Sequence, residues 1–294
     1  MDKPKKIDSR ECGLEIALVL GKWFLRTEHL HYGYWTDDLP VDLQNLRKAQ
    51  DKYSNFMISH IPEGVGTILD VGCGTGRLAL RLKEFGYQVD CVSPSSLLTK
   101  YVRNLLDNKS HIFESDYEEI ITENRYDLIL FGESFQYINL EKALRTSWKL
   151  LNDGGYLLIC DFFKMDAKGT SILRGGHKLA RFYDLVHQYP FKPILDIDIT
   201  KETAPNLDLV DDFLTNAGLP IYHSIVYFFG INYPILSKFL QWKYRKKFEK
   251  IKRKYFSGGM NAKDFETFKT YRLLLFGKTN SDVVRRQSSG TGQF

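Results

Sequence analysis

The sequence has few cysteines and no long apolar run. Its four cysteines, Cys12, Cys73, Cys91 and Cys160, lie far apart and form no C-x-x-C pair. We therefore expect reduced packing residues rather than a disulfide framework or a metal site. No apolar run approaches the roughly 18 residues of a membrane-spanning helix. The N-terminus carries acidic residues and no signal-peptide cleavage site, so these absences favour a cytoplasmic protein.

A strong charge imbalance is also missing. The formal net charge is +5 over 294 residues, which is too small to indicate nucleic-acid binding by itself. Apolar residues make up 43% of the chain and charged residues 26%, as in ordinary soluble globular proteins. The length allows one large α/β domain or two smaller ones, with a sizeable core in either case.

A glycine-rich turn is the most informative stretch of the chain. Residues 68–71 form a short, mainly apolar run that indicates a buried parallel strand. Gly72, Gly74 and Gly76 follow at alternate positions, and leucines at mainly helical spacing continue to Gly86. A strand, a glycine turn and a helix form the nucleotide-binding corner of a doubly wound sheet. Glycine suits this turn because the backbone must approach a ligand closely and adopt positive φ.

The spacing of the glycines narrows the choice of nucleotide. A dinucleotide site needs G-x-G-x-x-G with an acid about 20 residues later, but here Arg77 takes the third glycine position and Ser93 the acidic one. A P-loop ends in G-K-[ST], which Thr75-Gly76-Arg77 does not supply. The pattern D-x-G-x-G-x-G, beginning at Asp70, resembles motif I of the class I S-adenosylmethionine-dependent methyltransferases.

Strands and helices alternate beyond the turn. We expect strands at 68–71, 87–92, 111–114, 126–131, 156–163, 194–199 and 268–276, and a turn at 152–155. Helices are expected at 14–25 (buried), 41–61, 140–151 and 179–188 and over most of 206–257, with a loop or lid at 168–177. This order predicts an α/β fold with a parallel sheet. The expected divisions are 1–62 (N-terminal helical arm), 63–200 (core), 201–266 (helical insert), 267–279 (last core strand) and 280–294 (disordered tail).

Four further stretches support a family resemblance. They are His31-Tyr-Gly-Tyr-Trp35, Gly132-Glu-Ser-Phe-Gln-Tyr-Ile138, Leu151-Asn-Asp-Gly-Gly-Tyr156 and Asp198-Ile-Thr200. Together they resemble the branch that holds the rebeccamycin sugar O-methyltransferase, the tocopherol C-methyltransferases and the geranyl diphosphate C-methyltransferase. The resemblance implies a Rossmann-like seven-stranded sheet with its last strand antiparallel. It also implies a helical cap made by the arm and by the insert between strands six and seven.

The same resemblance implies a cofactor, S-adenosyl-L-methionine, and the residues that bind it. The turn would line the methionine part and Asp70 would lie near its amino group, Asp116 and Tyr117 would hold the adenine, and Gly132 and Glu133 would border the sulfonium. The cofactor-binding set is Asp70, Gly72, Cys73, Gly74, Gly76, Ser93, Ser95, Asp116, Tyr117, Gly132 and, from the arm, Tyr34.

Ribose recognition departs from the usual pattern. Most class I enzymes have a carboxylate at the end of the second strand, where this chain has Ser93. The resembling branch often has a hydroxyl residue there with a Gln five positions later, but here that later residue is Leu98. We therefore expect Ser93 and Ser95 to contact the ribose. A neutral hydrogen bond contributes about 0.5–1.5 kcal/mol against about 1.5–3 kcal/mol for a charged one, so affinity is expected to be weaker.

Four residues are candidates for catalysis, each with a structural alternative. Glu133 follows strand four, where a Glu acts as base in the prenyl diphosphate C-methyltransferases but elsewhere only lines the cofactor. Tyr137 could orient an acceptor hydroxyl or simply pack; it replaces, with Gln136, the two histidines of the rebeccamycin enzyme. Asp161 is a functional acid or a buried hydrogen-bonding residue. His177 lies in the presumed lid or has no special role.

The acceptor is expected to be small and largely apolar, with O- or C-methylation favoured. Aromatic residues crowd both the arm and the insert, although they could equally form the core of the cap. The open alternatives are a non-catalytic cofactor-binding protein and a methyltransferase of a membrane lipid or RNA. The signatures of the common DNA amino- and cytosine-C5 methyltransferases are lacking, so DNA is not expected. The oligomeric state is left open.

A basic helix closes the insert. Residues 242–254 hold eight Lys or Arg against one Glu, a local net charge of 8 − 1 = +7. An apolar stripe at helical spacing (Leu236, Leu240, Tyr244, Phe248, Ile251 and Tyr255) runs through it. The helix at 235–256 either makes peripheral contact with an anionic membrane or is a cap helix with a solvated basic face.

Overall fold

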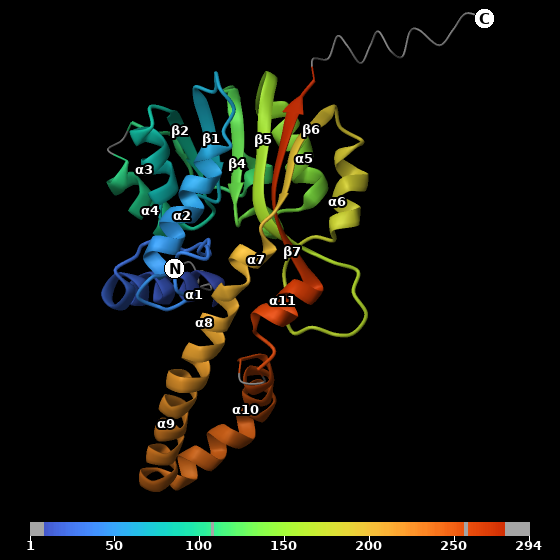
Figure 1. The fold of residues 1–294 in the computed structure, drawn as a ribbon. Coiled ribbons are helices and arrows are strands. Elements are labelled where there is room, and N and C mark those ends of the chain that lie inside the picture. The colour runs from blue at the N-terminus through green and yellow to red at the C-terminus, as the bar shows by residue number, and fades with distance from the viewer. Residues whose placement is uncertain (1–8, 107–108, 256–257, 280–294) are drawn as a thin grey trace, which may run out of the picture.

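The structure is a computed structural model that describes residues 9–106, 109–255 and 258–279, without the side chains of 9–12 and 251–255. The predicted disordered tail at 280–294 lies outside the described residues. Within them, a single seven-stranded sheet runs through the molecule in the order β3-β2-β1-β4-β5-β7-β6 (Figure 1). The strands are β1 (Thr67–Val71), β2 (Gln88–Val92), β3 (Ile112–Phe113), β4 (Tyr126–Gly132), β5 (Leu151–Lys164), β6 (Phe191–Asp198) and β7 (Lys269–Lys278).

All neighbouring strands pair in parallel except β7, which is antiparallel to both β5 and β6. The predicted α/β Rossmann-like sheet with a reversed last strand is therefore confirmed. The short αβ connections bring the carboxyl ends of the parallel strands to one edge of the sheet, where open α/β sheets bind their ligands.

Helices cover both faces of the sheet. The α-helices are α1 (Ser9–Leu20), α2 (Leu46–Ser59), α3 (Arg77–Glu84), α4 (Ser96–Leu105), α5 (Leu140–Leu150), α6 (Leu179–Val186), α7 (Thr200–Thr203), α8 (Pro205–Phe213), α9 (Leu219–Asn232), α10 (Pro234–Tyr255) and α11 (Ala262–Phe268). Short 3₁₀ turns are η2 (Tyr117–Glu119) and η3 (Phe135–Tyr137), and π-helical turns are η1 (Gly21–Leu25) and η4 (Leu214–Gly218).

Two hydrophobic clusters form the core, one on each face of the sheet. In β4, Leu128 and Leu130 join the cluster that contains α2, α3 and α4, whereas Ile129 and Phe131 join the cluster of α5 and α6. This division follows from the two-residue period of a strand. Because both faces are covered, the central strands are apolar on both sides, as a buried parallel sheet requires.

Three expectations about the elements are wrong in detail. The turn expected at 152–155 lies inside β5, where Gly154 has φ +77° and the register with β4 shifts by three residues, from Tyr126 opposite Leu151 to Leu128 opposite Tyr156. The helix expected at 41–61 begins only at Leu46. Residues 42–45 instead form a turn, in which the Asp42 carboxylate accepts the Asn45 N–H. The segment 14–25 is helical but not buried, since Leu18 and Gly21 are its only buried residues within the described side chains.

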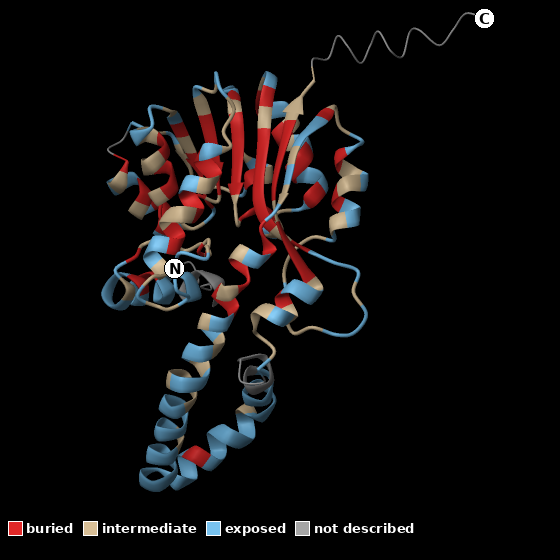
Figure 2. Cartoon of the chain, viewed as in Figure 1, coloured by how far each residue is buried: buried red, intermediate tan, exposed pale blue. Residues whose placement is uncertain are grey.

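The insert between β6 and β7 is a helical hairpin. The helix α8 packs beside the arm, and α9 and α10 then project away from the sheet before α11 returns to β7 (Figure 1). Their surface is almost wholly exposed (Figure 2). None of the described helices combines the length and the hydrophobicity that traversing a bilayer demands.

Candidate functional site

A cleft of about 1150 Å³ opens at the carboxyl ends of β1, β2 and β4. Its lining brings together most residues that the sequence analysis selected. They are Asp70, Gly72, Cys73, Gly74, Ser93, Ser95, Asp116, Tyr117, Gly132, Glu133 and Tyr137. The candidates Tyr34, Gly76, Asp161 and His177 do not line it.

The glycine turn needs glycine for two different reasons. At Gly72, with φ +74°, a Cβ would lie 2.3 Å from the Cβ of Ser134, so the close approach of β1 to β4 excludes any side chain. At Gly74, with φ +55°, a Cβ would meet only Leu30 Cδ1, at 3.9 Å. The space over Gly74 is therefore open to the cleft, and its backbone is accessible to a ligand.

Asp70 presents an unsatisfied carboxylate oxygen to this turn. Its side chain is buried, and Oδ2 has no hydrogen-bond partner within the described residues. Burial raises its pKa to about 7, because the charged form is desolvated with nothing opposite it. A buried acid of this kind needs a partner. A ligand ammonium group satisfies that need, so Asp70 fits the amino group of S-adenosylmethionine.

The end of β2 and the loop after β3 supply the remaining polar groups. Ser95 caps α4 by accepting from the Leu98 N–H at 3.3 Å, and its own N–H donates to Ser93 Oγ at 3.3 Å. Tyr117 directs its ring into the core, where its hydroxyl lies 3.0 Å from Ser147 Oγ. Only the backbone of Tyr117 is thus available to an adenine, beside the carboxylate of Asp116.

Glu133 is held in an unusual conformation at the end of β4. It adopts φ +58°, which is rare for a residue with a side chain. Its Oε1 accepts the backbone N–H of Tyr32 at 2.7 Å and the hydroxyl of Tyr271 at 2.8 Å. Both hydrogen bonds are made to Oε1, so Oε2 is the carboxylate oxygen that is left to contact a ligand in the cleft. Burial raises the pKa of Glu133 to about 8, with the nearby Asp161 carboxylate adding to the shift.

Two buried tyrosines support this carboxyl group from behind. The hydroxyls of Tyr271 and Tyr53 lie 2.7 Å apart, and Tyr53 is also 3.2 Å from the carbonyl of Cys160. Because the Tyr271 proton is donated to Glu133, the Tyr53 proton points to Tyr271 or to that carbonyl. Sequence reasoning missed both residues: their only signal was an apolar position on a helix and an aromatic one in the last strand.

Asp161 and His177 converge on the 3₁₀ turn η3 instead of on the cleft. Asp161 accepts the backbone N–H of Gln136 at 3.0 Å and its side-chain amide at 3.2 Å. His177 Nε2 lies 3.1 Å from the carbonyl of Phe135, and its ring packs edge-on against the Phe135 ring. The two side chains thus fix the turn that carries Tyr137 to the rim of the cleft.

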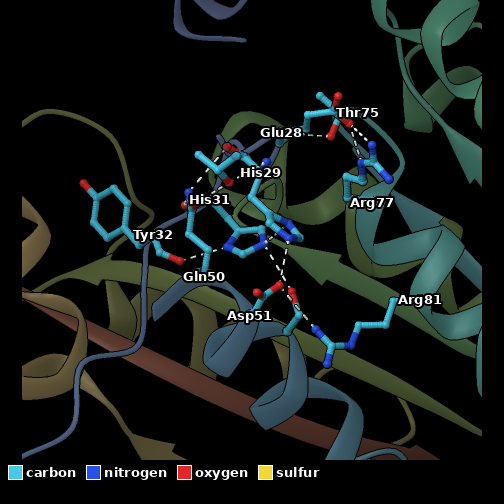
Figure 3. Close-up of polar contacts among 11 residues, drawn as sticks. Glu28, His29, His31, Tyr32, Gln50, Asp51, Thr75, Arg77 and Arg81 are labelled. Carbon is cyan, nitrogen blue, oxygen red and sulfur yellow. Dashed lines mark hydrogen bonds and ion pairs between the residues drawn. The ribbon is translucent and has the colours of Figure 1, made fainter. Parts of the chain in front are cut away.

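The N-terminal arm closes the cleft through a cluster of polar contacts (Figure 3). Glu28 forms an ion pair with Arg77, the first residue after the glycine turn, and a second with Lys22 at 2.9 Å. Its carbonyl accepts the hydroxyl of Thr75 at 2.7 Å. These ion pairs hold the pKa of Glu28 down, at about 2, against the opposing effect of burial. Sequence reasoning missed Glu28, because only the folded chain brings it to the turn.

Two neutral histidines continue the arm along the cleft. His31 Nδ1 lies 2.8 Å from the carbonyl of Tyr32 and must donate to it, so Nε2 accepts from His29 Nδ1 at 3.0 Å. Burial lowers their pKa values, to about 4 for His29 and about 3 for His31. Tyr34 stacks on Phe56 with ring centroids 4.8 Å apart, outside the lining. The arm therefore lines the cleft with imidazole rings and not with Tyr34.

Sequence comparisons relate the chain to methyltransferases. A family model described as a methyltransferase domain matches residues 69–159. An uncharacterised methyltransferase of Staphylococcus carnosus is 27% identical over 177 residues, which are 57% of this chain and 83% of that protein. Another, of Bacillus cytotoxicus, is 27% identical over 146 residues, which are 47% of this chain and 68% of that protein.

Solved structures show the same fold at low identity. The cyclase SpnF has a TM-score of 0.63 and 16% identity, covering 92% of this chain and 96% of its own. The geranyl diphosphate C-methyltransferase of Streptomyces coelicolor A3(2), solved with S-adenosyl-L-homocysteine, has a TM-score of 0.62 and 14% identity, covering 94% and 100%. The fold of this chain is thus that of the Rossmann-like methyltransferases.

The residues present fit the cofactor that these similarities imply. The space over the Gly74 backbone is open. At the same turn, Asp70 Oδ2 has no partner among the described residues and can accept from a ligand cation. The methyltransferase-domain match begins at residue 69 and contains the whole glycine turn. The chain is an S-adenosylmethionine-dependent methyltransferase with a Rossmann-like fold.

Proposed function

We propose that the protein methylates an oxygen or carbon atom of a small, largely apolar and uncharged acceptor, with Glu133 as the general base. The observation that supports this proposal is the state of Glu133, which lines the cleft: its pKa is raised to about 8, and the hydrogen bonds from Tyr32 and Tyr271 both fall on Oε1. A base with a pKa near the working pH is the most effective proton acceptor.

The charges of the lining support an uncharged acceptor. Arg77 is the only Lys or Arg among the described residues that line the cleft, and Glu28 already pairs with it. The two imidazoles, His29 and His31, are neutral at pH 7 because burial lowers their pKa values. A carboxylate or phosphate on the acceptor would therefore find no free cation. Apolar side chains, among them Leu14, Leu30 and Ile138, lie in the same lining.

Each group near Glu133 has a defined task in this proposal. S-adenosylmethionine, when bound, supplies an activated methyl group. Glu133 Oε2 takes the proton from the acceptor, while the Tyr32 N–H and the Tyr271 hydroxyl donate to Oε1, which stabilises the carboxylate that acts as the base and holds it in place. Asp161 and His177 keep η3 in place, so that Tyr137 borders the acceptor. Alignment by such contacts contributes much of the rate in a displacement reaction.

The test is a Glu133→Gln variant assayed with a library of hydrophobic phenols and prenyl compounds. We expect kcat to fall about 10²- to 10⁴-fold, while calorimetry shows unchanged affinity for S-adenosylhomocysteine. Wild-type activity in the variant would exclude Glu133 as the base. Turnover of charged amines alone would contradict the proposed acceptor class. Binding of S-adenosylhomocysteine without turnover of any acceptor would favour a non-catalytic binding protein.

The proposed acceptor also bears on location. An apolar acceptor partitions into membranes, and the basic helix α10 offers a means to reach one. We therefore propose a cytoplasmic protein in peripheral contact with an anionic membrane, supported by the exposure of Lys243, Lys246, Lys247 and Lys250 on α10.

A further inference from the structure

The hairpin of α9 and α10 leaves an unusual amount of apolar surface in water. Residues 213–242 contain one Lys and no Arg, Asp or Glu. The side chains of Tyr227, Ile231, Ile235 and Trp242 are 73%, 65%, 86% and 76% exposed. A helix that is apolar around its whole circumference is normally buried in a core or a membrane. The aromatic residues of the insert therefore do not form the core of a cap.

The polarity of the hairpin changes along its length. The turn between the helices, at Tyr233-Pro234, and the first nine residues of α10 are mainly apolar, with Lys238 as the one charged residue. Lys243, Arg245, Lys246 and Lys247 then follow as an exposed basic band nearer to the sheet, with Trp242 at the boundary. A segment that enters a membrane meets three layers in turn. Apolar side chains lie among the acyl chains, an aromatic residue lies at the interface, and cations contact the anionic headgroups. The hairpin has these groups in the same order.

The dimensions of the apolar end match one leaflet. The helix α9 has 14 residues, which is roughly 21 Å at 1.5 Å per residue. The nine residues of α10 before the basic band extend roughly 13 Å. One leaflet contributes about 15 Å of hydrocarbon, half of a bilayer core.

Several polar groups of the apolar end bond within the hairpin. Asn232 Nδ2 donates to the carbonyl of Phe228 at 2.9 Å, and the Tyr233 N–H donates to the carbonyl of Phe229 at 3.0 Å at the end of α9. Ser237 is buried and accepts from Gln241 at 3.1 Å. Hydrocarbon tolerates a backbone only in this condition. Lys238 has a long apolar stem that can carry its ammonium group towards the interface.

We propose that the hairpin 219–255 inserts its apolar end into one leaflet of an anionic membrane, with the basic band at the headgroups. This deepens the proposed function, on which it rests only for the identity of the acceptor. Both ends of the insert that carries the hairpin, where β6 ends at Asp198 and β7 begins at Lys269, lie at the carboxyl edge of the sheet (Figure 1). Insertion would hence bring the cleft to the surface in which an apolar acceptor dissolves.

The test is co-sedimentation of the full chain with vesicles of neutral lipid or of neutral lipid with anionic phosphatidylserine, at low and at physiological salt. The end variant is Ile231→Asp with Ile235→Asp; the band variant is Lys246→Glu with Lys247→Glu. The matched control is Ile121→Asp, since Ile121 is 94% exposed on a loop before β4. Lipids brominated on their acyl chains give a second readout, because they quench a tryptophan that enters hydrocarbon.

We expect wild type and the control to pellet with anionic vesicles, and brominated lipid to quench wild type more than Trp242→Phe. The end variant should lose binding at least tenfold at both salt concentrations. The band variant should lose the part of binding that salt weakens.

Several results would overturn the proposal. They are equal pelleting with neutral vesicles, absence of pelleting at low salt, and unchanged quenching in Trp242→Phe. A concentration-dependent dimer that the end variant abolishes, without vesicle binding by wild type, would assign the surface to a second copy of the chain. Turnover of a dispersed apolar acceptor, measured on the same variants, separates membrane insertion from the proposed catalytic function. We expect this turnover to depend on Glu133 and to be unaffected by the hairpin substitutions.

Discussion

The sheet and the projecting hairpin have similar apolar content but opposite burial. Leu128, Ile129, Leu130 and Phe131 of β4 are all 0% exposed, because helices of the same chain cover both faces of the sheet. No element of the described chain covers α9 in the same way. Apolar residues of the sheet thus drive folding, whereas those of the hairpin are available for association.

The largest contrast is expected between core and hairpin substitutions. Leu130→Ala leaves a cavity at the centre of the sheet and should lower the free energy of unfolding by about 2–5 kcal/mol. Ile235→Ala removes an exposed side chain and should change it by about 0.5 kcal/mol or less. Denaturant titration of both variants in the absence of lipid measures the difference. Similar losses would mean that the hairpin is folded against the core.

Within the core, the glycine turn can be broken at a single position. Gly72→Ala combines a Cβ clash with Ser134 and a φ of +74°, and should cost about 2–4 kcal/mol of stability and abolish S-adenosylhomocysteine binding. Gly64→Ala is the matched control, since its φ is +82° but nothing lies within 4 Å of the added Cβ. Only the cost of the left-handed backbone, about 1–2 kcal/mol, is expected there, with full binding. Equal binding by both variants would refute the close-packed turn.

The partly buried acid at the cleft, Glu133, makes stability depend on pH. The folded pKa of Glu133 is raised from 4.5 to about 8, so its contribution is fully present below about pH 4.5 and is lost as pH rises through 8. Glu133→Gln keeps an oxygen that can accept from Tyr32 and Tyr271. Because the amide does not ionise, the variant should not lose stability as the pH rises. It should be more stable than wild type by about 2 kcal/mol at pH 8, and equal near pH 4.5. Thermal melts across this range provide the measurement, with Glu84→Gln, on the surface, as control.

The polar contacts of the arm should have the smallest effect on stability. Glu28→Gln weakens the pairs with Arg77 and Lys22, and should cost about 1 kcal/mol. Because the pKa of Glu28 is lowered to about 2, this stabilisation is present above about pH 4.5 and is lost as pH falls through 2. The variant should also release S-adenosylhomocysteine faster in stopped-flow experiments. Asp38→Asn, which removes the exposed Lys52 pair, should not. Equal release rates for wild type and Glu28→Gln would show that the arm does not retain the ligand.

Much of the sheet and the cofactor side of the cleft could be predicted from the sequence. Runs of apolar residues and the glycine spacing are local signals, so the strands near Asp70 and Gly132 were found within a residue or two. The contacts that complete the site are not local. Tyr271 reaches Glu133 across 138 positions, and Glu28 reaches Arg77 across 49, and no spacing rule encodes such pairs.

Exposure was the property that the sequence indicated least well. An apolar helix reads the same whether a core, a partner or a lipid covers it, so 14–25 was expected to be buried and is mostly exposed. Asp161 illustrates the same limit in a polar residue. Its alternatives, an acid of the reaction or a structural hydrogen-bonding group, differ only in which way the carboxylate points, and the structure directs it to Gln136.

The reversed strand β7 has a consequence for how such a chain can be modified. Since β7 runs against β6, with Asp198 paired to Arg272, both ends of the insert leave from one place at the edge of the sheet. Lengthening a segment whose ends are already adjacent costs little chain entropy, about 0.6 kcal/mol for each doubling. The insert can therefore be exchanged, shortened or replaced without changing the connections of the sheet. The reversed direction of β7 therefore creates a site at the edge of the sheet, near the cleft, where inserts of different length can be joined.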